Sequence, residues 1–359
     1  MSTSGTVGQT VIDVDTLIGH AMRRCGLTTG DITVEHGQLA RNNLYFYLSN
    51  LANHGINLWT ISRDIYGVKS ASARIVLPLG TVGVLNANYR TLSRVDGSGG
   101  AFASSGTAAN AFDADTSTAC INTAVNGNIG TNLGVATSVT SIGIMAYGAQ
   151  TLTPVIEYSD DGLVTWTTLY TPPGDQGGTT IAFADYQWAW WDIPYPGDHV
   201  AYRIRETAGA TMALREIVLG NTPSEIPMAR LNRDDYSALP NKTTAGPKSL
   251  QFWFDRQRLQ PEMYLWPLPN NSFDQIVIFR HRQIQDVGAL TNEVEVPQRW
   301  VDAIVANLAL RMGYELPGVQ MDRLNMLQQV AQAATYEAEQ EERDDSPIYL
   351  YPAISVYTR

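Results

Sequence analysis

The sequence predicts a multidomain α+β protein, in which a helical domain with a small β element is interrupted by an all-β sandwich. Near both ends of the chain, apolar residues recur at helical spacing. The middle instead alternates short apolar runs with Gly, Ser, Thr and Asn turns. The charges change at the same places, because no lysine or arginine lies between Arg94 and Arg203. We therefore expect an insert at 94–224, a host at 1–93 and 225–346, and a tail at 347–359.

The first host segment contains two predicted helices. The first covers 13–25, where Asp13 can cap the start and Gly26 can end the helix. Its apolar stripe has the spacing i, i+3, i+4, i+7, i+8, i+11 and consists of Val14, Leu17, Ile18, Ala21, Met22 and Cys25. The second predicted helix covers about 34–53, and residues 73–90 read as extended segments broken at Pro78 and Gly80.

The second host segment begins with aromatic strands at 249–255, 263–269 and 275–282. A helix follows from near Pro297 to about Glu315, and because it is apolar nearly all round we expect it to be buried on several sides. The last predicted helix covers 321–343. Its seam of small and apolar residues allows close packing and consists of Leu324, Leu327, Ala331, Ala334 and Ala338.

The insert has a low content of positive charge and many short strands. Residues 94–224 contain 4 basic and 12 acidic side chains, and the remainder of the chain contains 20 and 23. The stretch "VIEYSDDGLVTW" (155–166) reads as two strands joined by a tight Asp-Asp-Gly turn. Several such segments at short spacing predict an antiparallel sandwich.

The totals argue against several classes of protein. The net charge of −11 argues against tight binding of nucleic acid through phosphates. Cys25 and Cys120 lie far apart and form neither a disulfide framework nor a metal site, which suits a reducing compartment. We expect no signal peptide and no membrane span. Five scattered histidines and the lack of a nucleophile or phosphate-binding motif predict no enzyme, no resident metal and no cofactor.

The host resembles a known family of viral proteins. The segments that carry the resemblance are "ALPNK", "DRQ", "LWPLP" and "VPQRWVDAIVANLA", which follow two N-terminal helices and "VLPLGTVGVLNANYR". In this order they are similar to the head-to-tail adaptor proteins of short-tailed bacteriophages, the group that includes tail tubular protein A and the tail accessory factor. The resemblance covers roughly 11–93 and 225–350. None of these segments is a catalytic signature.

The resemblance implies a virion structural protein at the head–tail junction, assembled in the cytoplasm of the host bacterium. Such adaptors form a twelve-subunit ring under the portal, contact the tail nozzle or a fibre protein, and extend the channel for double-stranded DNA without sequence-specific contact. The acidic face at Glu337–Glu342 would then line the channel, or it is only a solvated face. In some relatives the C-terminal segment binds the portal, which would assign docking to Ile348, Tyr349, Leu350, Tyr351, Ile354, Tyr357 and Arg359. The alternative is a tail that folds back on its own core.

The insert resembles the discoidin-like, galactose-binding-like jelly rolls through "AANAFDADTSTAC", "GNIGTNLG" and "YRIRE…LREIVLG". Trp188, Trp190 and Tyr195 are candidates for stacking on a sugar, although aromatic residues in strands are usually core. Asp113 and Asp115 are candidate Ca²⁺ ligands, and Asx-turns explain the same residues. The alternative function is thus a glycan-binding, lectin-like surface protein that acts through the insert.

Overall fold

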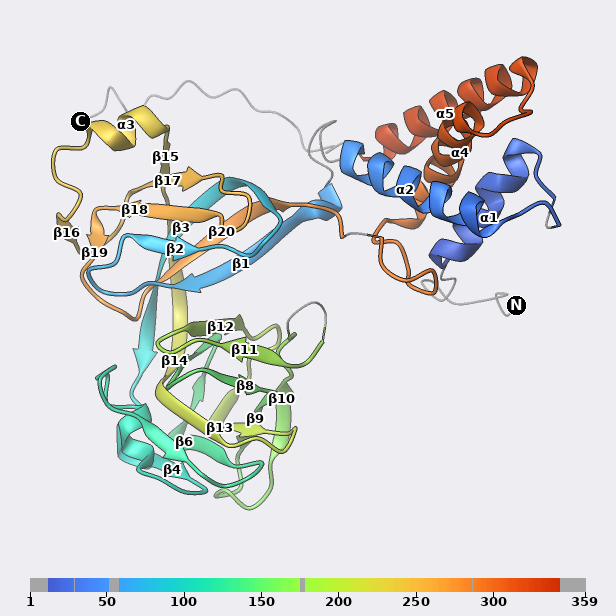
Figure 1. Ribbon diagram of the computed structural model, residues 1–359. Coiled ribbons are helices and arrows are strands. Elements are labelled where there is room, and N and C mark those ends of the chain that lie inside the picture. Colours follow the sequence, from blue (N-terminus) through green and yellow to red (C-terminus); the bar gives the residue numbers. More distant parts are fainter. Residues whose placement is uncertain (1–11, 29, 52–57, 175–177, 286, 343–359) are drawn as a thin grey trace. The chain divides into compact units, whose positions relative to one another are not determined.

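The computed structural model describes residues 12–28, 30–51, 58–174, 178–285 and 287–342 (Figure 1). The chain divides into two compact units. The first, which we call the helical unit, comprises Met1–Ile61 and Arg282–Arg359. The second, which we call the β unit, comprises Ser62–His281. Each unit has its own apolar core.

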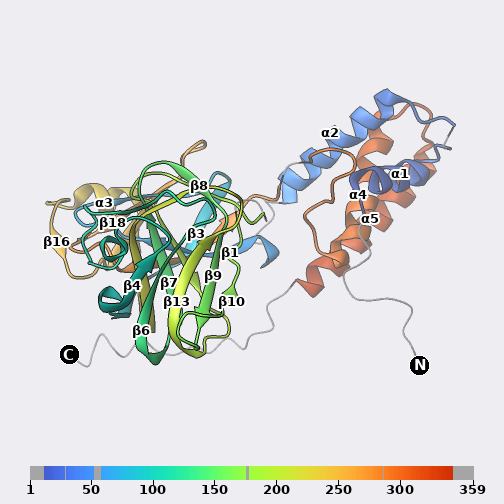
Figure 2. The ribbon, with the colours of Figure 1, turned by 90° about the horizontal axis from the view of Figure 1, so that it is seen from below.

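The helical unit is built around a central helix, α4. Its elements are α1 (Val14–Cys25), α2 (Val34–Leu51), the short 3-10 helix η1 (Leu58–Thr60), α4 (Gln298–Glu315) and α5 (Met321–Glu341). Helix α4 packs against α1, α2 and α5 (Figure 1, Figure 2). This explains why its sequence is apolar nearly all round. The four helices predicted for the host are therefore present, with ends within two residues of the predictions.

Helix α1 shows how the local sequence determines its bounds. The Asp13 carboxylate accepts a hydrogen bond from the Thr16 backbone N–H at 2.8 Å, which caps the first turn. Gly26 ends the helix with φ of +97°, a conformation that glycine adopts without steric cost. All six residues of the predicted stripe are buried. They pack against α4, where Trp300, Ile304 and Leu308 are at most 2% exposed.

The β unit contains the strands and one short helix, α3 (Arg233–Ala238). Its strands are β1 (Ile61–Gly67), β2 (Arg74–Val76), β3 (Thr81–Val95), β4 (Ala101–Ala103), β5 (Cys120–Asn122), β6 (Asn128–Ser138), β7 (Ser141–Ala146), β8 (Gln150–Leu152), β9 (Pro154–Ser159), β10 (Thr167–Tyr170), β11 (Ile181–Phe183), β12 (Trp188–Asp192), β13 (Asp198–Glu206), β14 (Met212–Pro227), β15 (Ala229–Leu231), β16 (Ala245–Gly246), β17 (Gln251–Asp255), β18 (Glu262–Trp266), β19 (Leu268–Pro269) and β20 (Gln275–Arg282). The 3-10 turns η2 (Ser98–Gly100) and η3 (Ala108–Ala111) complete it.

The insert is an antiparallel sandwich, as predicted. One layer is the five-stranded sheet β10-β9-β13-β6-β4, and the other contains β14, β7, β12 and β5. A hairpin is present as the pair β9 and β10, in which Thr167 lies opposite Tyr158. Its second strand begins at Thr167, after a longer connection than the tight turn predicted within 155–166. Alternate residues of facing strands fill the core, for example Ile142, Ile144 and Ile204.

The host strands form a second β layer that is larger than the small β element predicted. A four-stranded sheet, β15-β17-β18-β2, packs against the long sheet through Phe252, Met263 and Ile276, each at most 1% exposed. The long sheet has the order β1-β20-β3-β14-β7-β12 and contains both host and insert strands. The host is therefore not a mainly helical domain, because its middle part is β structure that belongs to the same unit as the insert.

The predicted insert boundaries at 93/94 and 224/225 correspond to positions inside strands. β3 and β14 run from the host layer into the sandwich as one antiparallel pair (Figure 1). Leu219 lies opposite Val95 at the insert end, and Pro227 lies opposite Asn88 at the host end. A bulge between Asn221 and Ser224 lies where the strand pair runs from the host layer into the sandwich. The sandwich and the host layer are therefore joined by a continuous strand pair rather than by linkers.

Candidate functional site

Two of the three aromatic candidates for sugar binding are buried. Trp188 and Trp190 are 9% and 5% exposed, and their rings stack on each other with centroids 5.0 Å apart. They belong to a cluster with Met145 and Val218 of the insert, packed against Ile65, Leu92 and Phe273 of the host layer. The close fit requires glycine at 67, where a Cβ would lie 2.4 Å from the Trp188 ring. The prediction that Trp188 and Trp190 stack on a sugar is therefore wrong, because the host layer covers both rings.

Charged residues surround the same junction. Asp192 of β12 accepts from Arg90 of β3 at 2.7 Å and from Arg63 of β1 at 2.9 Å. Glu225 lies 3.5 Å from Arg63. The Arg90 side chain is 4% exposed, so its charge depends on these carboxylates for compensation. Apolar packing and ion pairs together fix the insert on the host layer.

The third aromatic candidate, Tyr195, is 90% exposed. It lies in the turn between β12 and β13. No second aromatic ring among the described ring pairs stacks on it. Tyr195 is therefore available to a ligand, without the two tryptophans that the sequence placed beside it.

The two calcium candidates take part in local turns. One Asp113 oxygen accepts from the Asp115 backbone N–H at 2.9 Å, and the other accepts from the Thr118 hydroxyl at 2.8 Å. Asp115 accepts from the backbone N–H and the hydroxyl of Ser117. These are Asx-turns, which the sequence left open as the second interpretation. Among the described residues, no three His, Cys, Asp or Glu side chains are grouped so that they could hold a metal ion.

A buried carboxyl group lies beside this loop. Glu216 of β14 is 2% exposed, and its Oε1 has no hydrogen-bond partner among the described residues. Burial, and next the neighbouring Asp113 carboxylate, raise the pKa of Glu216 to about 8. The group is therefore protonated at neutral pH. The sequence offered no sign of this, because Glu216 and Asp113 are a hundred positions apart and meet only in the fold.

An aromatic and cationic cluster, which the sequence did not reveal, lies at one end of the sandwich. The Arg215 guanidinium lies over the rings of Tyr186 and Tyr147, at 3.6 Å and 4.6 Å from their centroids. Asp185 holds it at 3.1 Å. The Lys69 ammonium group of the host also lies over the Tyr186 ring, at 4.8 Å from its centroid. The two tyrosines are 36% and 40% exposed, so this end offers aromatic surface beside positive charge in an acidic domain.

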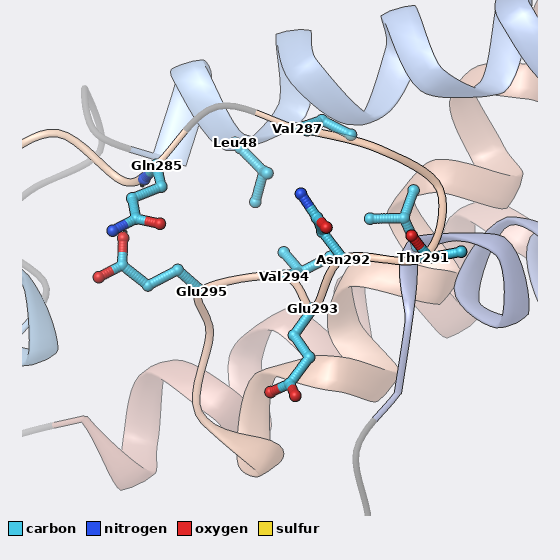
Figure 3. A pocket seen from close by; sticks show the side chains of 10 residues that line it. Leu48, Gln285, Val287, Thr291, Asn292, Glu293, Val294 and Glu295 are labelled. Atoms are coloured by element: carbon cyan, nitrogen blue, oxygen red, sulfur yellow. Dashed lines mark hydrogen bonds between the residues drawn. The ribbon is translucent and has the colours of Figure 1, made fainter. Parts of the chain in front are cut away.

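A polar pocket of about 380 Å³ lies in the helical unit, between α2 and the segment 285–295 (Figure 3). Leu48 points into it from α2, and Gln285, Asn292 and Glu295 line it from the segment (Figure 3). Glu295 already pairs with Arg282 and accepts from the Gln285 backbone N–H at 2.9 Å. The Glu295 carboxylate is thus used to hold the segment.

The helical unit exposes large apolar side chains on its helix faces. Tyr45 and Phe46 of α2 are 46% and 57% exposed. On α5, Met326 and Val330 lie one turn apart and are 67% and 43% exposed. The other exposed large apolar residues of this unit are Val34, Leu290, Tyr314, Met321 and Tyr336.

The predicted portal-docking residues Ile348, Tyr349, Leu350, Tyr351, Ile354, Tyr357 and Arg359 lie outside the described residues. None of the described helices is long and apolar enough to cross a membrane. Among the described residues, His199 and Asp160 form the one histidine–carboxylate ion pair, with Nδ1 of the histidine 2.9 Å from the carboxylate. The His199 ring stacks on the Tyr158 ring.

No protein-family model and no curated protein matches the chain. Similar solved structures include chitosan-binding module 1 of a chitosanase/glucanase from Paenibacillus sp. IK-5, at 20% identity over 36% of this chain and 99% of that one, with a TM-score of 0.27. The family 32 carbohydrate-binding module of Clostridium perfringens NanJ, in complex with galactose, has 16% identity over 36% and 100%, with a TM-score of 0.30. CBM62 of Clostridium thermocellum Xyl5A has 18% identity over 36% and 98%, with a TM-score of 0.30. Each of these similarities covers 36% of this chain.

Proposed function

We propose that this chain is a structural protein of a bacteriophage virion, an adaptor subunit that forms a ring, joins the portal to the tail and extends the DNA channel. The observation that carries the proposal is the apolar surface on the outer faces of α2 and α5, where Phe46, Met326 and Val330 are exposed. A ring requires two different faces on each subunit. Two helices with exposed apolar residues can supply such faces.

The charges of the helical unit agree with a channel for DNA. On α5, Glu337, Glu339 and Glu341 are exposed. Carboxylates facing a DNA channel disfavour tight contact with phosphates, which lets the duplex slide. In this proposal the tail residues 347–359 bind the portal, and the insert faces a tail fibre, the capsid or a neighbouring insert.

The experiment is a mass measurement of the purified chain, alone and mixed with the portal protein of the same virus. We expect a monomer that joins a closed ring of about twelve copies when the portal is present. Deletion of 347–359 should abolish attachment to the portal without unfolding the chain. Unchanged attachment would reject the tail assignment, and a monomer at every portal concentration would reject the adaptor.

The second candidate function is glycan binding by the insert. The specific observation in its favour is the cluster at one end of the sandwich, where Tyr147 and Tyr186 are exposed beside Arg215 and Lys69. Aromatic faces next to hydrogen-bond donors suit a sugar ring. A glycan array with the whole chain tests it, with Tyr186→Ala as the site variant and Tyr195→Ala as the control at a separate exposed tyrosine. Binding that is lost in the first variant and kept in the second would support this site.

A further inference from the structure

An apolar groove of about 450 Å³ lies between α1 and α4 in the helical unit. Its floor is formed by Leu17 and Val305, which are 1% and 5% exposed, and Ile12 and Val301 are half-buried at its sides. The polar rim consists of His20, Arg24, Gln298 and Asp302. Arg24 and Asp302 form an ion pair of 2.5 Å across the rim. The groove therefore has the apolar floor and polar border of a binding site for an apolar segment.

The C-terminal tail leaves the described part of the chain close to this groove. Helix α5 ends at Glu341, and the Glu342 carboxylate accepts from Arg299 Nη2 at 2.5 Å and from Trp300 Nε1 at 3.4 Å. Both partners belong to the first turn of α4. Gln298 and Val301 of the same turn line the groove. Glu342 therefore lies beside the turn of α4 that lines the groove, about one helix width, roughly 10 Å, from the groove itself.

The chain after Glu342 is long enough to reach the groove. Residues 343–359 follow. An extended chain covers at most about 3.3–3.6 Å per residue, so even the first half of this segment spans roughly 25 Å. Residues 348–354 are therefore within reach of the groove.

The composition of the tail matches the groove. The stretch "IYLYPAI" (348–354) combines Ile, Leu and Tyr with Pro352, which disfavours a helix and favours an extended segment. In an extended segment, Ile348 and Leu350 point to the same side, so both can enter an apolar floor. The N-terminal segment "MSTSGTVGQT" (1–10) is small and polar, which makes it the poorer occupant.

We propose that residues 348–354 occupy the α1–α4 groove of their own chain. The tail is then held on its own helical unit, and a partner that binds the tail must first take it from this groove. The occupancy itself does not depend on the proposed adaptor function. Only the identity of the partner, the portal, rests on that function.

The experiment uses the full-length chain carrying Gln298→Cys at the groove and Leu350→Cys in the tail. The natural cysteines do not interfere, since Cys25 and Cys120 are buried. We expect an intramolecular disulfide to form under mild oxidation at least ten times faster than in the control pair Glu337→Cys and Leu350→Cys. Glu337 lies on α5 near the exit of the tail but outside the groove. Mass spectrometry of the monomer identifies the linked peptides.

A third substitution tests the chemistry of the groove. Adding Val301→Asp should reduce the rate for the groove pair to that of the control pair, while Val330→Asp, an exposed apolar site on α5, should leave it unchanged. Circular dichroism establishes that both variants are folded. If Val301→Asp unfolds the chain, Val301→Thr replaces it. Equal rates at groove and control positions would overturn the proposal, and so would disulfides that form only between two chains.

Discussion

The helical unit and the insert differ in where their apolar side chains are exposed. The insert is rich in aromatic residues, yet Trp188 and Trp190 are buried against Ile65 and Phe273 of the host layer. Several of its exposed apolar residues, such as Val125, Val164 and Tyr195, lie singly in turns, although Ile121 and Val135 are exposed on β5 and β6. In the helical unit, by contrast, exposed apolar residues lie along helix faces, in particular Tyr45 and Phe46 on α2 and Met326 and Val330 on α5.

This difference concerns which apolar faces have a packing partner within the chain. The apolar outer face of the insert sheet already has one, because the same chain supplies the host layer that covers it. The outer faces of α2 and α5 have no such cover within the described residues. Single apolar side chains in turns need no explanation, whereas several on one helix face do. Assembly is therefore expected through the helical unit rather than through the insert.

The largest expected effect is on assembly. Replacing Met326 and Val330 together by Glu should abolish ring formation in the presence of the portal, because two charges on one helix face would have to be desolvated in the interface. Size-exclusion chromatography with light scattering measures the assembled mass. The matched control is Val164→Glu, an exposed apolar residue in an insert turn. An equal loss of assembly in the control would remove the distinction between the two regions.

The next effect concerns the junction between insert and host layer. Trp188→Ala should lower the free energy of unfolding of the β unit by about 3–5 kcal/mol, because a buried indole ring leaves a cavity. Urea denaturation followed by circular dichroism measures it. Val164→Ala, which removes exposed atoms only, serves as the control. A loss below about 1 kcal/mol for Trp188→Ala would mean that the tryptophans do not hold the two layers together.

We expect the stability of the insert to depend on pH through Glu216. Its pKa is about 8 in the folded chain, well above the value of about 4.3 for an unfolded chain. Between these values the folded state binds one proton more than the unfolded state, so the stability contribution is present at low pH and is lost as pH rises toward 8. Unfolding in urea at pH 5, 6.5 and 8 should therefore show a decline, on the order of a few kcal/mol, that Glu216→Gln removes. The same decline in both proteins would contradict the assignment.

The smallest effect concerns the ion pairs at the junction. Asp192→Asn should cost about 1–3 kcal/mol, because the nearly buried Arg90 loses its closest carboxylate. Asp198→Asn at the exposed start of β13 is a suitable control. Equal stability of the two variants would show that apolar packing alone fixes the insert on the host layer.

Excision of residues 95–222 sharpens the comparison further. The ends are adjacent, since Leu219 lies opposite Val95 in the ladder. The sequence predicts that the host folds without its insert, since closely spaced ends tolerate removal. The excision also uncovers Ile65, Leu92 and Phe273. We therefore expect a folded but less soluble host that binds more apolar dye than the intact chain does. Global unfolding would show that the β unit folds as a single cooperative body.

The sequence by itself determined the local elements. The stripe from Val14 to Cys25 and the cap at Asp13 predicted α1, and the turn at Asp161 predicted the hairpin of β9 and β10, because such signals depend on residues a few positions apart. Asp161 holds this turn by accepting from Thr165 and Ser159, which lower its pKa to about 2.

Only the tertiary structure decided which faces are covered. Alternation places Trp188 and Trp190 on one face of a strand, but it does not say whether water or the host layer lies against that face. The continuous pair of β3 and β14, the meeting of Glu216 with Asp113, and the groove between α1 and α4 likewise arise from residues far apart in the chain. Periodicity reports the direction of a side chain, whereas burial and pKa depend on the distant segment that packs against it.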